Sequence, residues 1–291
     1  MQQQTIHQAL VLAKQMLPVV TDVPMWEAEQ LLANVLNAPR SYLYAYPEAV
    51  LTMEQSQKFI AVIFRRMGGE PIPYLTGHCE FWALALRVTP DTLIPRPETE
   101  LLVELLLERL GQDAVVADLG TGSGAVALAL ATERPQWVIY ATDHSPAALA
   151  VAQANAQRLG LTQIHFRQGD WCAALAEDTI GCSHKYQLFH AIVSNPPYIS
   201  EVDWRVYGEG LKFEPRTALV AGERGLSEIK KIIVDGRRHL ESGGYIMIEH
   251  GFAQGAVVRH LLQQANYQEV ATYKDLAGRE RVTGGIILGM P

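Results

Sequence analysis

The chain has 291 residues, enough for one large domain or for a large and a small one. Its formal charge of -7 and isoelectric point of about 5.7 argue against a large nucleic-acid groove, which normally needs a basic face. Its three cysteines, Cys79, Cys172 and Cys182, show no metal-ligand spacing, so we expect no metal site and a reducing environment.

The start of the chain does not resemble a targeting segment. Its first five residues contain neither the basic cluster nor the apolar stretch of a signal peptide. No apolar run in the sequence approaches the roughly 18 residues that suggest a membrane span. We therefore expect a cytoplasmic protein with no membrane partner.

Residues 1–70 carry helical patterns and are predicted to form a small helical N-terminal domain. Apolar residues over 6–17 follow the 3.6-residue period of a helix. A second helix is predicted with Pro24 in its first turn. A third is predicted to begin after Thr52, whose hydroxyl suits an N-cap, and to end at Gly68.

Residues 71–97 are predicted to connect two domains. The stretch 81–88 has the character of a strand or hairpin. The stretch 89–97 contains three prolines, which favour an extended backbone. This segment is either a stiff linker or a lip over an active site, and the sequence does not choose between the two.

Residues 98–291 alternate between helix and strand patterns. Such alternation predicts an α/β fold with a parallel, doubly wound, Rossmann-like sheet. The last two strand patterns, 270–273 and 281–288, are separated only by a short turn with Gly278, so we expect them to be antiparallel. The expected strands before them are 114–119, 138–143, 163–167, 188–194 and 245–250, and the expected helices are 98–110, one from Gly124, 146–159 and 226–240.

A glycine-rich turn lies between the first of these strands and the next helix. The turn reads Asp118-Leu-Gly120-Thr-Gly122-Ser-Gly124. Glycine lets the backbone turn sharply and approach a ligand without an intervening Cβ atom. The segment is therefore a candidate cofactor loop, although a simple tight turn is the alternative.

The turn by itself fits two cofactor classes. Gly120-x-Gly122-x-x-Ala125 satisfies the dinucleotide fingerprint, and Asp143 lies about twenty residues on, where a ribose-binding acid is expected. Asp118 before the glycines instead matches the form usual in methyltransferases. The proline motif described below has no role in hydride transfer, so we favour a methyltransferase.

Acidic and aromatic residues follow the next two strands. The carboxylate of Asp143 can accept both hydroxyls of a ribose, or it can serve only as the N-cap of the helix that follows. After the third strand, Asp170 can receive an adenine amine and Trp171 can form an apolar wall for the ring.

The most informative motif is Asn195-Pro196-Pro197-Tyr198, which follows the short apolar strand ending at Ser194. The two prolines stop the strand and stiffen the backbone. The side chain of Asn195 and the carbonyl of Pro196 then form two fixed acceptors beside an aromatic ring. This arrangement suits a planar group with an NH2, such as an amide or an exocyclic amine, although the segment could be only a loop of turn-forming residues.

Two further polar residues have weaker interpretations. His250, after the fifth strand, could be a base, but we favour a role in local loop packing. Cys172 beside Trp171 is predicted to be a buried filler and not a nucleophile.

Taken together, these motifs resemble those of the peptide-chain-release-factor glutamine methyltransferases, the HemK/PrmC group. The resemblance extends from about Arg65 to the end of the chain. The predicted N-terminal helices before it match the family only in their size and in the general character of their sequence. The matching segments are Gly69–Gly77, Glu80–Trp82, Thr92–Glu100, Asp118–Gly124, Gly169–Trp171, Asn195–Tyr198, Phe213–Pro215, Glu249–Gly251 and Asp275–Gly278.

This resemblance implies a cofactor and a substrate. The cofactor is S-adenosyl-L-methionine, and the substrate is the glutamine in the Gly-Gly-Gln loop of class-one peptide chain release factors, whose body the N-terminal helices would dock. By the same resemblance, the residues that hold the cofactor are Gly120, Thr121, Gly122, Ser123, Gly124, Asp143, Trp171 and Asn195, and the catalytic clamp on the substrate amide is Asn195, Pro196, Pro197 and Tyr198.

The chain departs from the family pattern at Gly210 and Lys212, in a loop expected to face the substrate. Two other functions stay open. An adenine N6-methyltransferase acting on DNA or RNA uses a similar clamp, but it must accept a flipped base and usually adds a basic region that this acidic chain lacks. A noncatalytic adaptor of the same fold would not need an intact clamp and glycine turn.

Overall fold

The computed structural model describes residues 4–175 and 188–288; Cys182 lies outside these ranges. The chain forms two compact units, Met1–His78 and Cys79–Pro291. The expected connector 71–97 contributes to both of them, because its first part is helical and belongs to the first unit.

The first unit is helical. Thr52 caps α4 as expected: its hydroxyl accepts a hydrogen bond from the Gln55 amide at 3.2 Å, and the Gln55 side chain accepts one from the Thr52 amide at 2.9 Å. Leu17, Leu32 and Ile63 are fully buried between the helices. The helices are α1 (Ile6–Met16), which continues into the 3-10 turn η1 (Leu17–Val19), α2 (Pro24–Leu36), α3 (Arg40–Ala45), α4 (Met53–Met67) and α5 (Ile72–Thr76).

The second unit is built on a seven-stranded sheet in the order β5-β4-β3-β6-β7-β9-β8. The strands from β5 to β7 are parallel to one another, and β9 is antiparallel to both β7 and β8. The predicted Rossmann-like sheet with an antiparallel last pair is therefore confirmed. The strands are β3 (Val115–Leu119), β4 (Val138–Asp143), β5 (Ile164–Gln168), β6 (Phe189–Ser194), β7 (Leu240–Glu249), β8 (Gln268–Lys274) and β9 (Glu280–Ile286), and β1 (His78–Phe81) pairs separately with β2 (Leu84–Arg87).

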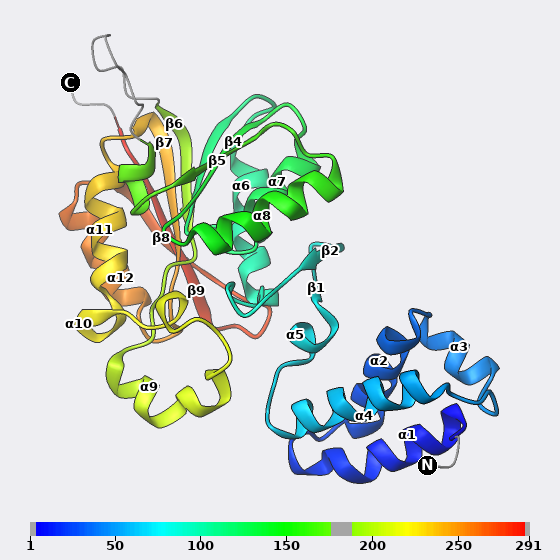
Figure 1. Cartoon of the computed structure of the whole chain (residues 1–291). Coiled ribbons are helices and arrows are strands. Elements are labelled where there is room, and N and C mark those ends of the chain that lie inside the picture. The colour runs from blue at the N-terminus through cyan, green and yellow to red at the C-terminus, as the bar shows by residue number, and fades with distance from the viewer. Residues whose placement is uncertain (1–3, 176–187, 289–291) are drawn as a thin grey trace. The chain divides into compact units, whose positions relative to one another are not determined.

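Helices cover both faces of this sheet (Figure 1). On one face lie α6 (Glu100–Arg109), α7 (Ala125–Glu133) and α8 (Pro146–Leu159). On the other lie α11 (Ser227–Gly236) and α12 (Gly255–Gln264). Because both faces are covered, the central strands are buried on both sides and their sequences are almost continuously apolar.

Some boundaries differ from the expected ones. The helix expected over 226–240 ends at Gly236, because Leu240 already pairs with Phe189 and begins β7 five residues earlier than expected. Helix α12 was not expected; its buried residues are Gly255, Val258 and Leu262, which make a short apolar pattern, and Val257 is exposed. The helix expected over 98–110 begins as the 3-10 turn η2 (Pro97–Thr99), and its α-helical part starts at Glu100. The short elements that were not expected are α9 (Glu201–Tyr207), α10 (Gly222–Gly225), η3 (Trp171–Leu175), η4 (Gly208–Leu211) and η5 (Arg216–Ala218).

The start of α7 depends on Gly124. This residue has a φ of 88°, in the region that favours glycine. A Cβ atom on it would lie 2.8 Å from Leu128 Cδ1 and 3.2 Å from Ala152 Cβ. The absence of a side chain therefore lets the glycine turn pack against α7 and α8.

We predict that Gly124→Ala destabilises the second unit by more than Gly243→Ala does. Gly243 has nearly the same φ, 86°, but open space where its Cβ would lie. Both changes impose a backbone strain of about 1–3 kcal/mol, and overlap at Gly124 adds roughly another 1–3 kcal/mol. Urea unfolding of the two variants measures the difference, and equal losses would show that the packing at Gly124 relaxes freely.

Candidate active site

A cavity of about 410 Å³ opens at the carboxyl ends of the parallel strands. Its size lies within the range of about 300–1,000 Å³ typical of small-molecule sites, and its position is the usual one for ligands in open α/β sheets. Part of the lining comes from the ends of four neighbouring strands: Gly120 and Gly122 after β3, Asp143 at the end of β4, Asp170 and Trp171 after β5, and Asn195 and Pro197 after β6.

The other residues predicted for the site do not line this cavity. Thr121, Ser123 and Gly124 belong to the glycine turn but are turned into the protein, where Thr121 and Ser123 are buried. In the proline motif, Pro196 and Tyr198 likewise lie outside the lining. The structure therefore separates the predicted residues into those that face the cavity and those that support its walls.

Asp143 joins the loops after β3 and β4. Its Oδ2 accepts a hydrogen bond from the Gly122 amide at 2.9 Å, and its Oδ1 accepts one from the Ser145 amide at 2.8 Å. Ser145 is the N-cap of α8, with its hydroxyl accepting from Ala148, so the simple N-cap interpretation of Asp143 is wrong. A carboxylate has about four acceptor positions, so these two bonds leave about two of them unused.

Asp118 supports the glycine turn from below. It is 3% exposed, and its Oδ2 accepts hydrogen bonds from the Thr121 hydroxyl at 2.6 Å and from the Ala127 amide at 3.2 Å. Burial raises the pKa of this carboxyl to about 6, against the lowering effect of the two hydrogen bonds. Asp118 therefore fixes the shape of the turn and does not itself line the cavity.

A buried asparagine holds the turn from the side. Asn155 on α8 donates to the carbonyl of Ser123 at 2.9 Å and to the carbonyl of Arg87 at 3.0 Å, and it accepts from the Arg87 amide at 2.7 Å. The sequence interpretation did not include Asn155. Its only sequence signal is a polar side chain on the inward side of an alanine-rich helix.

Trp171 lines the cavity next to Gly120. A Cβ atom on Gly120 would lie 2.9 Å from the Trp171 ring, so the ring packs directly on the turn. The indole N–H donates to Glu228 of α11 at 2.8 Å, and Glu228 forms an ion pair with Lys231 at 3.0 Å. Glu228 also lines the cavity, although the sequence did not predict it.

The proline-rich segment forms part of the cavity wall, as the lip interpretation expects. Pro90, Asp91, Thr92 and Leu93 line the cavity. The segment that follows is anchored by the buried Glu214, which accepts a hydrogen bond from the Ile94 amide at 3.0 Å and forms an ion pair with Arg96.

Asn195 is positioned from two directions. At the end of β6, the Ser194 hydroxyl donates to the Leu119 carbonyl of β3 at 2.7 Å. The side-chain NH2 of Asn195 donates to the Thr99 hydroxyl at 3.1 Å, so its carbonyl oxygen is the end of the amide that can act as an acceptor.

The backbone after Asn195 is also held by distant segments. Gln254 donates to the Tyr198 carbonyl at 3.1 Å, and Gly225 lets its own backbone approach that carbonyl closely. Ile199 forms a parallel bridge with Val220. The proline motif is therefore a fixed part of the site.

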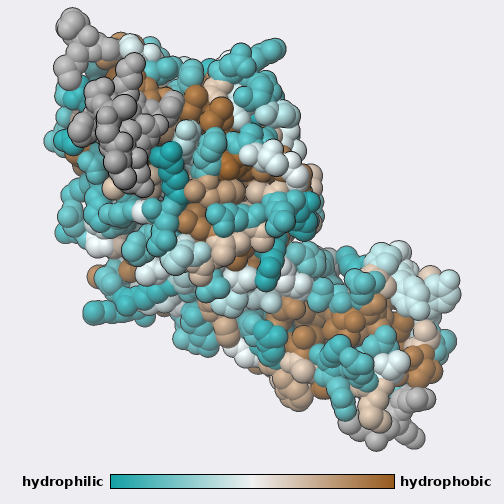
Figure 2. Space-filling view, turned by 45° about the horizontal axis from the view of Figure 1, so that its top comes forward, coloured by the Kyte–Doolittle hydropathy of each residue, from teal (hydrophilic) through white to brown (hydrophobic). Residues whose placement is uncertain are grey.

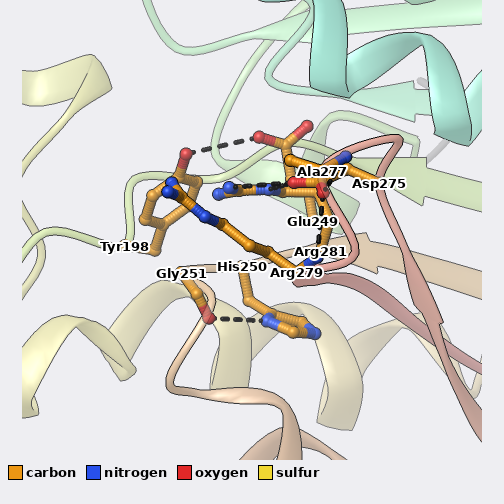
Figure 3. Close-up of polar contacts among 8 residues, drawn as sticks. All are labelled: Tyr198, Glu249, His250, Gly251, Asp275, Ala277, Arg279 and Arg281. Carbon is orange, nitrogen blue, oxygen red and sulfur yellow. Dashed lines mark hydrogen bonds and ion pairs between the residues drawn. The ribbon is translucent and has the colours of Figure 1, made fainter.

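Figure 3 shows the polar contacts of Tyr198, the last residue of the clamp, and of His250. The Tyr198 hydroxyl donates to Glu249 Oε1 at 3.3 Å. His250 is fully buried, and its two ring nitrogens contact the Gly251 carbonyl at 2.9 Å and the Thr283 hydroxyl at 2.7 Å. Burial lowers the pKa of His250, and the contacts fit the packing role expected for it.

The loop that departs from the family pattern lies outside the cavity lining. Lys212 forms an ion pair with Glu209 at 2.5 Å, and a Cβ on Gly210 would have open space around it. Cys172 is buried, and burial raises the pKa of its thiol to about 12, which fits the expected filler role.

Comparison with known families agrees with both units. Residues 8–77 match the family model of the PrmC N-terminal domain, and residues 97–207 match the methyltransferase small domain. A release factor glutamine methyltransferase from Coxiella burnetii is 46% identical over 280 residues, which are 96% of this chain and 97% of that protein.

The chain belongs to the release factor glutamine methyltransferase family. The Escherichia coli K12 member is 47% identical over 266 residues, 91% of this chain and 93% of that protein. The N-terminal helices therefore also belong to the family, although their motifs alone resembled it only in size and general character.

Solved structures show the same fold at low identity. The hMettl16 catalytic domain in complex with the MAT2A 3′UTR hairpin 6 gives a TM-score of 0.57 at 15% identity, covering 86% of this chain and 94% of that one. The Thermus thermophilus 16S rRNA N2 G1207 methyltransferase RsmC, in complex with AdoMet and guanosine, gives 0.51 at 19% identity, covering 72% and 49%. Both likenesses support the methyltransferase fold.

Two kinds of feature are absent from residues 4–175 and 188–288. No helix in these ranges has the length and apolar character needed to cross a membrane. The same ranges contain no group of three or more His, Cys, Asp or Glu side chains suited to a metal ion.

The raised pKa of Asp118 predicts a pH-dependent stability difference between the wild type and Asp118→Asn. Between the ordinary pKa of 3.8 and the folded pKa of about 6, the folded protein holds a proton that the unfolded chain releases. Wild-type stability should therefore fall relative to the variant by about 2–3 kcal/mol as pH rises through this window, and then level off. Urea unfolding from pH 4 to 8 measures the difference; a constant difference would contradict the raised pKa.

Proposed function

We propose that the protein transfers the methyl group of S-adenosyl-L-methionine to the side-chain amide nitrogen of glutamine in the Gly-Gly-Gln motif of class-one release factors. The observation that carries this proposal is a shared cavity. Asp143 and the glycine turn face it from one side, and Asn195 and Pro197 face it from the other. The residues proposed to bind the nucleoside and the residues proposed to bind the amide therefore line the same cavity.

The cavity wall fits the cofactor. Gly120 and Gly122 present bare backbone to the cavity, and Trp171 offers an aromatic wall. The two unused acceptor positions of Asp143 suit the two hydroxyls of a ribose, and its bonds to Gly122 and Ser145 hold the carboxylate still. We assign the ribose contact to Asp143, the adenine side to Asp170 and Trp171, and the methionine part to the glycine turn.

The clamp addresses the weakness of an amide as a nucleophile. The nitrogen lone pair of an amide is delocalised into its carbonyl, so the nitrogen reacts only if it is held and its developing positive charge is stabilised. Asn195 Oδ1 and the Pro196 carbonyl would each accept one N–H of the substrate glutamine, with Pro197 and Tyr198 shaping the pocket around it. When bound, S-adenosylmethionine supplies an electrophilic methyl group on a positively charged sulfur.

Positioning and electrostatics then account for most of the rate. The two acceptor oxygens orient the nitrogen and interact more strongly with its N–H groups as positive charge grows. The nitrogen loses one proton after the methyl group arrives, and this proton can leave to solvent. The enzyme acts on a translation factor, so we place it in the cytoplasm and assign it a role in translation termination.

The helical unit is proposed to dock the body of the release factor. Its described surface exposes several aromatic side chains, including Tyr44 at 64% and Phe64 at 59%. Figure 2 shows apolar surface on this unit. Exposed aromatic residues are enriched in protein interfaces, so residues 1–70 suit a protein partner.

We predict that Asn195→Ala lowers the methylation rate by about 10²–10³-fold while leaving cofactor affinity nearly unchanged. The loss corresponds to one preorganised group that stabilises the transition state, worth roughly 2.7–4 kcal/mol. Single-turnover methylation at saturating cofactor measures the rate, and calorimetry measures the affinity. A rate within a few-fold of wild type would remove Asn195 from the mechanism.

The proposed substrate is tested by three acceptors: a release factor with Gly-Gly-Gln, its Gln→Ala variant, and duplex DNA. Mass spectrometry after incubation with labelled cofactor should find one methyl group on the glutamine of the first acceptor alone. Deletion of residues 1–70 should reduce methylation of the intact factor far more than cofactor binding. Methylated DNA would favour the adenine N6-methyltransferase alternative, and an undiminished Gln→Ala signal would indicate another protein site.

A further inference from the structure

A single glutamine side chain joins three segments next to the clamp. Gln254 lies in the turn between β7 and α12 and is partly buried. Its side-chain NH2 donates to the carbonyl of Tyr198 at 3.1 Å and to the carbonyl of Arg224 at 3.3 Å. Its Oε1 accepts a hydrogen bond from the Gly251 amide at 2.8 Å. Gln254 therefore binds the last residue of the clamp, α10 and the loop after β7 at one point.

These contacts use both ends of the glutamine amide. The NH2 group has two hydrogens, and two backbone carbonyls accept from it, whereas the oxygen accepts from a backbone N–H. A carboxylate of the same size at position 254 could still accept from Gly251. It could not donate to Tyr198 or to Arg224, so the function of the side chain at this position depends on its NH2.

The turn that presents the Arg224 carbonyl has an unfavourable backbone. Glu223, Arg224 and Gly225 have φ values of 51°, 61° and 84°, a region that residues with a side chain rarely adopt. A Cβ atom on Gly225 would lie 2.1 Å from the Tyr198 oxygen and 2.9 Å from Gln254 Nε2. Strained backbone persists only where its surroundings impose it, and it is concentrated at functional sites. Here it packs directly on the carbonyl that Gln254 binds.

The contact at Tyr198 acts on the whole clamp. Pro196 and Pro197 have no N–H with which to bind a neighbouring segment, and their rings restrict the backbone. A displacement at one end of such a short, stiff run is passed to the other end. Asn195 and Pro197 line the cavity, whereas Gln254 does not. A shift of the Tyr198 carbonyl would therefore also move the groups that face the substrate amide.

We propose that Gln254 is a positioning residue for methyl transfer, which fixes the clamp by holding the carbonyl of Tyr198. The proposal rests on the function proposed above for the clamp. Since Gln254 does not line the cavity, the loss of its NH2 should lower the rate of methyl transfer and leave the affinity for the cofactor unchanged.

Two variants and a matched control test this role. Gln254→Glu keeps the size and the acceptor for Gly251 but removes both donors, and Gln254→Ala removes all three contacts without adding a charge. Gln163→Glu is the control, because Gln163 donates to the Ala131 carbonyl at 3.0 Å and neither residue lines the cavity. Thermal unfolding and calorimetry with S-adenosylmethionine verify the fold and the cofactor site of each variant.

We expect both Gln254 variants to lower kcat on a Gly-Gly-Gln release factor by on the order of 10–100-fold, as for a displaced catalytic group. The cofactor affinity of both variants and the kcat of Gln163→Glu should stay within about twofold of wild type. Wild-type kcat in Gln254→Ala, or a fall in kcat matched by an equal loss of cofactor affinity, would overturn the proposal.

The pH dependence separates a donated hydrogen bond from a general loss of packing. A protonated carboxyl can donate one hydrogen bond, and two facing carbonyls raise the pKa of a carboxyl at position 254. The kcat of Gln254→Glu, divided by that of wild type at the same pH, should therefore recover in part as the pH falls from about 8 to about 5.5. The same ratio for Gln254→Ala should stay constant. A constant ratio for Gln254→Glu would contradict the role of the donor.

A further readout does not depend on methylation. The chain has two Tyr-Ile pairs, Tyr198-Ile199 and Tyr245-Ile246, so labelling the tyrosine carbonyl with 13C and isoleucine with 15N gives one carbonyl signal for each pair. The Tyr198 signal, identified by its loss in Tyr198→Phe, should shift in both Gln254 variants, and the Tyr245 signal should not. An unshifted Tyr198 signal would overturn the proposal even if methylation is confirmed. An inactive wild type whose Tyr198 signal still shifts in the variants would support the contact and reject the proposed function alone.

Discussion

The end of β4 holds the loop that begins after β3, and the geometry of the site depends on this contact. The amides of Gly120 and Thr121 both donate to the Thr142 carbonyl, and the next amide, that of Gly122, donates to the Asp143 carboxylate. Three successive N–H groups are therefore bound by two residues of the neighbouring strand. This contact fixes the backbone that faces the cavity and orients the carboxylate beside it. Asp143 can then present its remaining acceptor positions without rearrangement.

The proline motif on the opposite wall of the cavity is held in place in a different way. Proline lacks an N–H and restricts the backbone, so the clamp cannot stabilise itself through its own backbone hydrogen bonds. Distant groups supply the missing contacts: Thr99 on the side chain of Asn195, and Gln254 on the carbonyl of Tyr198. Rigidity at the clamp is therefore a property of the assembled second unit. Such rigidity is what the proposed pair of acceptor oxygens would need, because electrostatic catalysis depends on groups that are already in place.

Buried carboxylates support both walls. Asp118 lies under the glycine turn and Glu249 lies behind the clamp, and burial raises the pKa of each of them. Both are costly to ionise where they lie, and both accept hydrogen bonds from side chains that shape the cavity. The two raised pKa values fit the tendency of shifted pKa values to cluster at functional sites.

The sequence by itself determined the sheet, the Thr52 cap and the residues at the strand ends, because these follow from local periodicity, turn chemistry and motif order. It also indicated the family, since its motifs lie in a fixed order along the chain. Only the tertiary structure decided which side chains support the site. Asn155, Glu228 and Thr99 join segments far apart in sequence, and no local pattern distinguishes such a residue from an ordinary polar one. Long-range packing creates these contacts, so they become visible only when the strands are placed side by side.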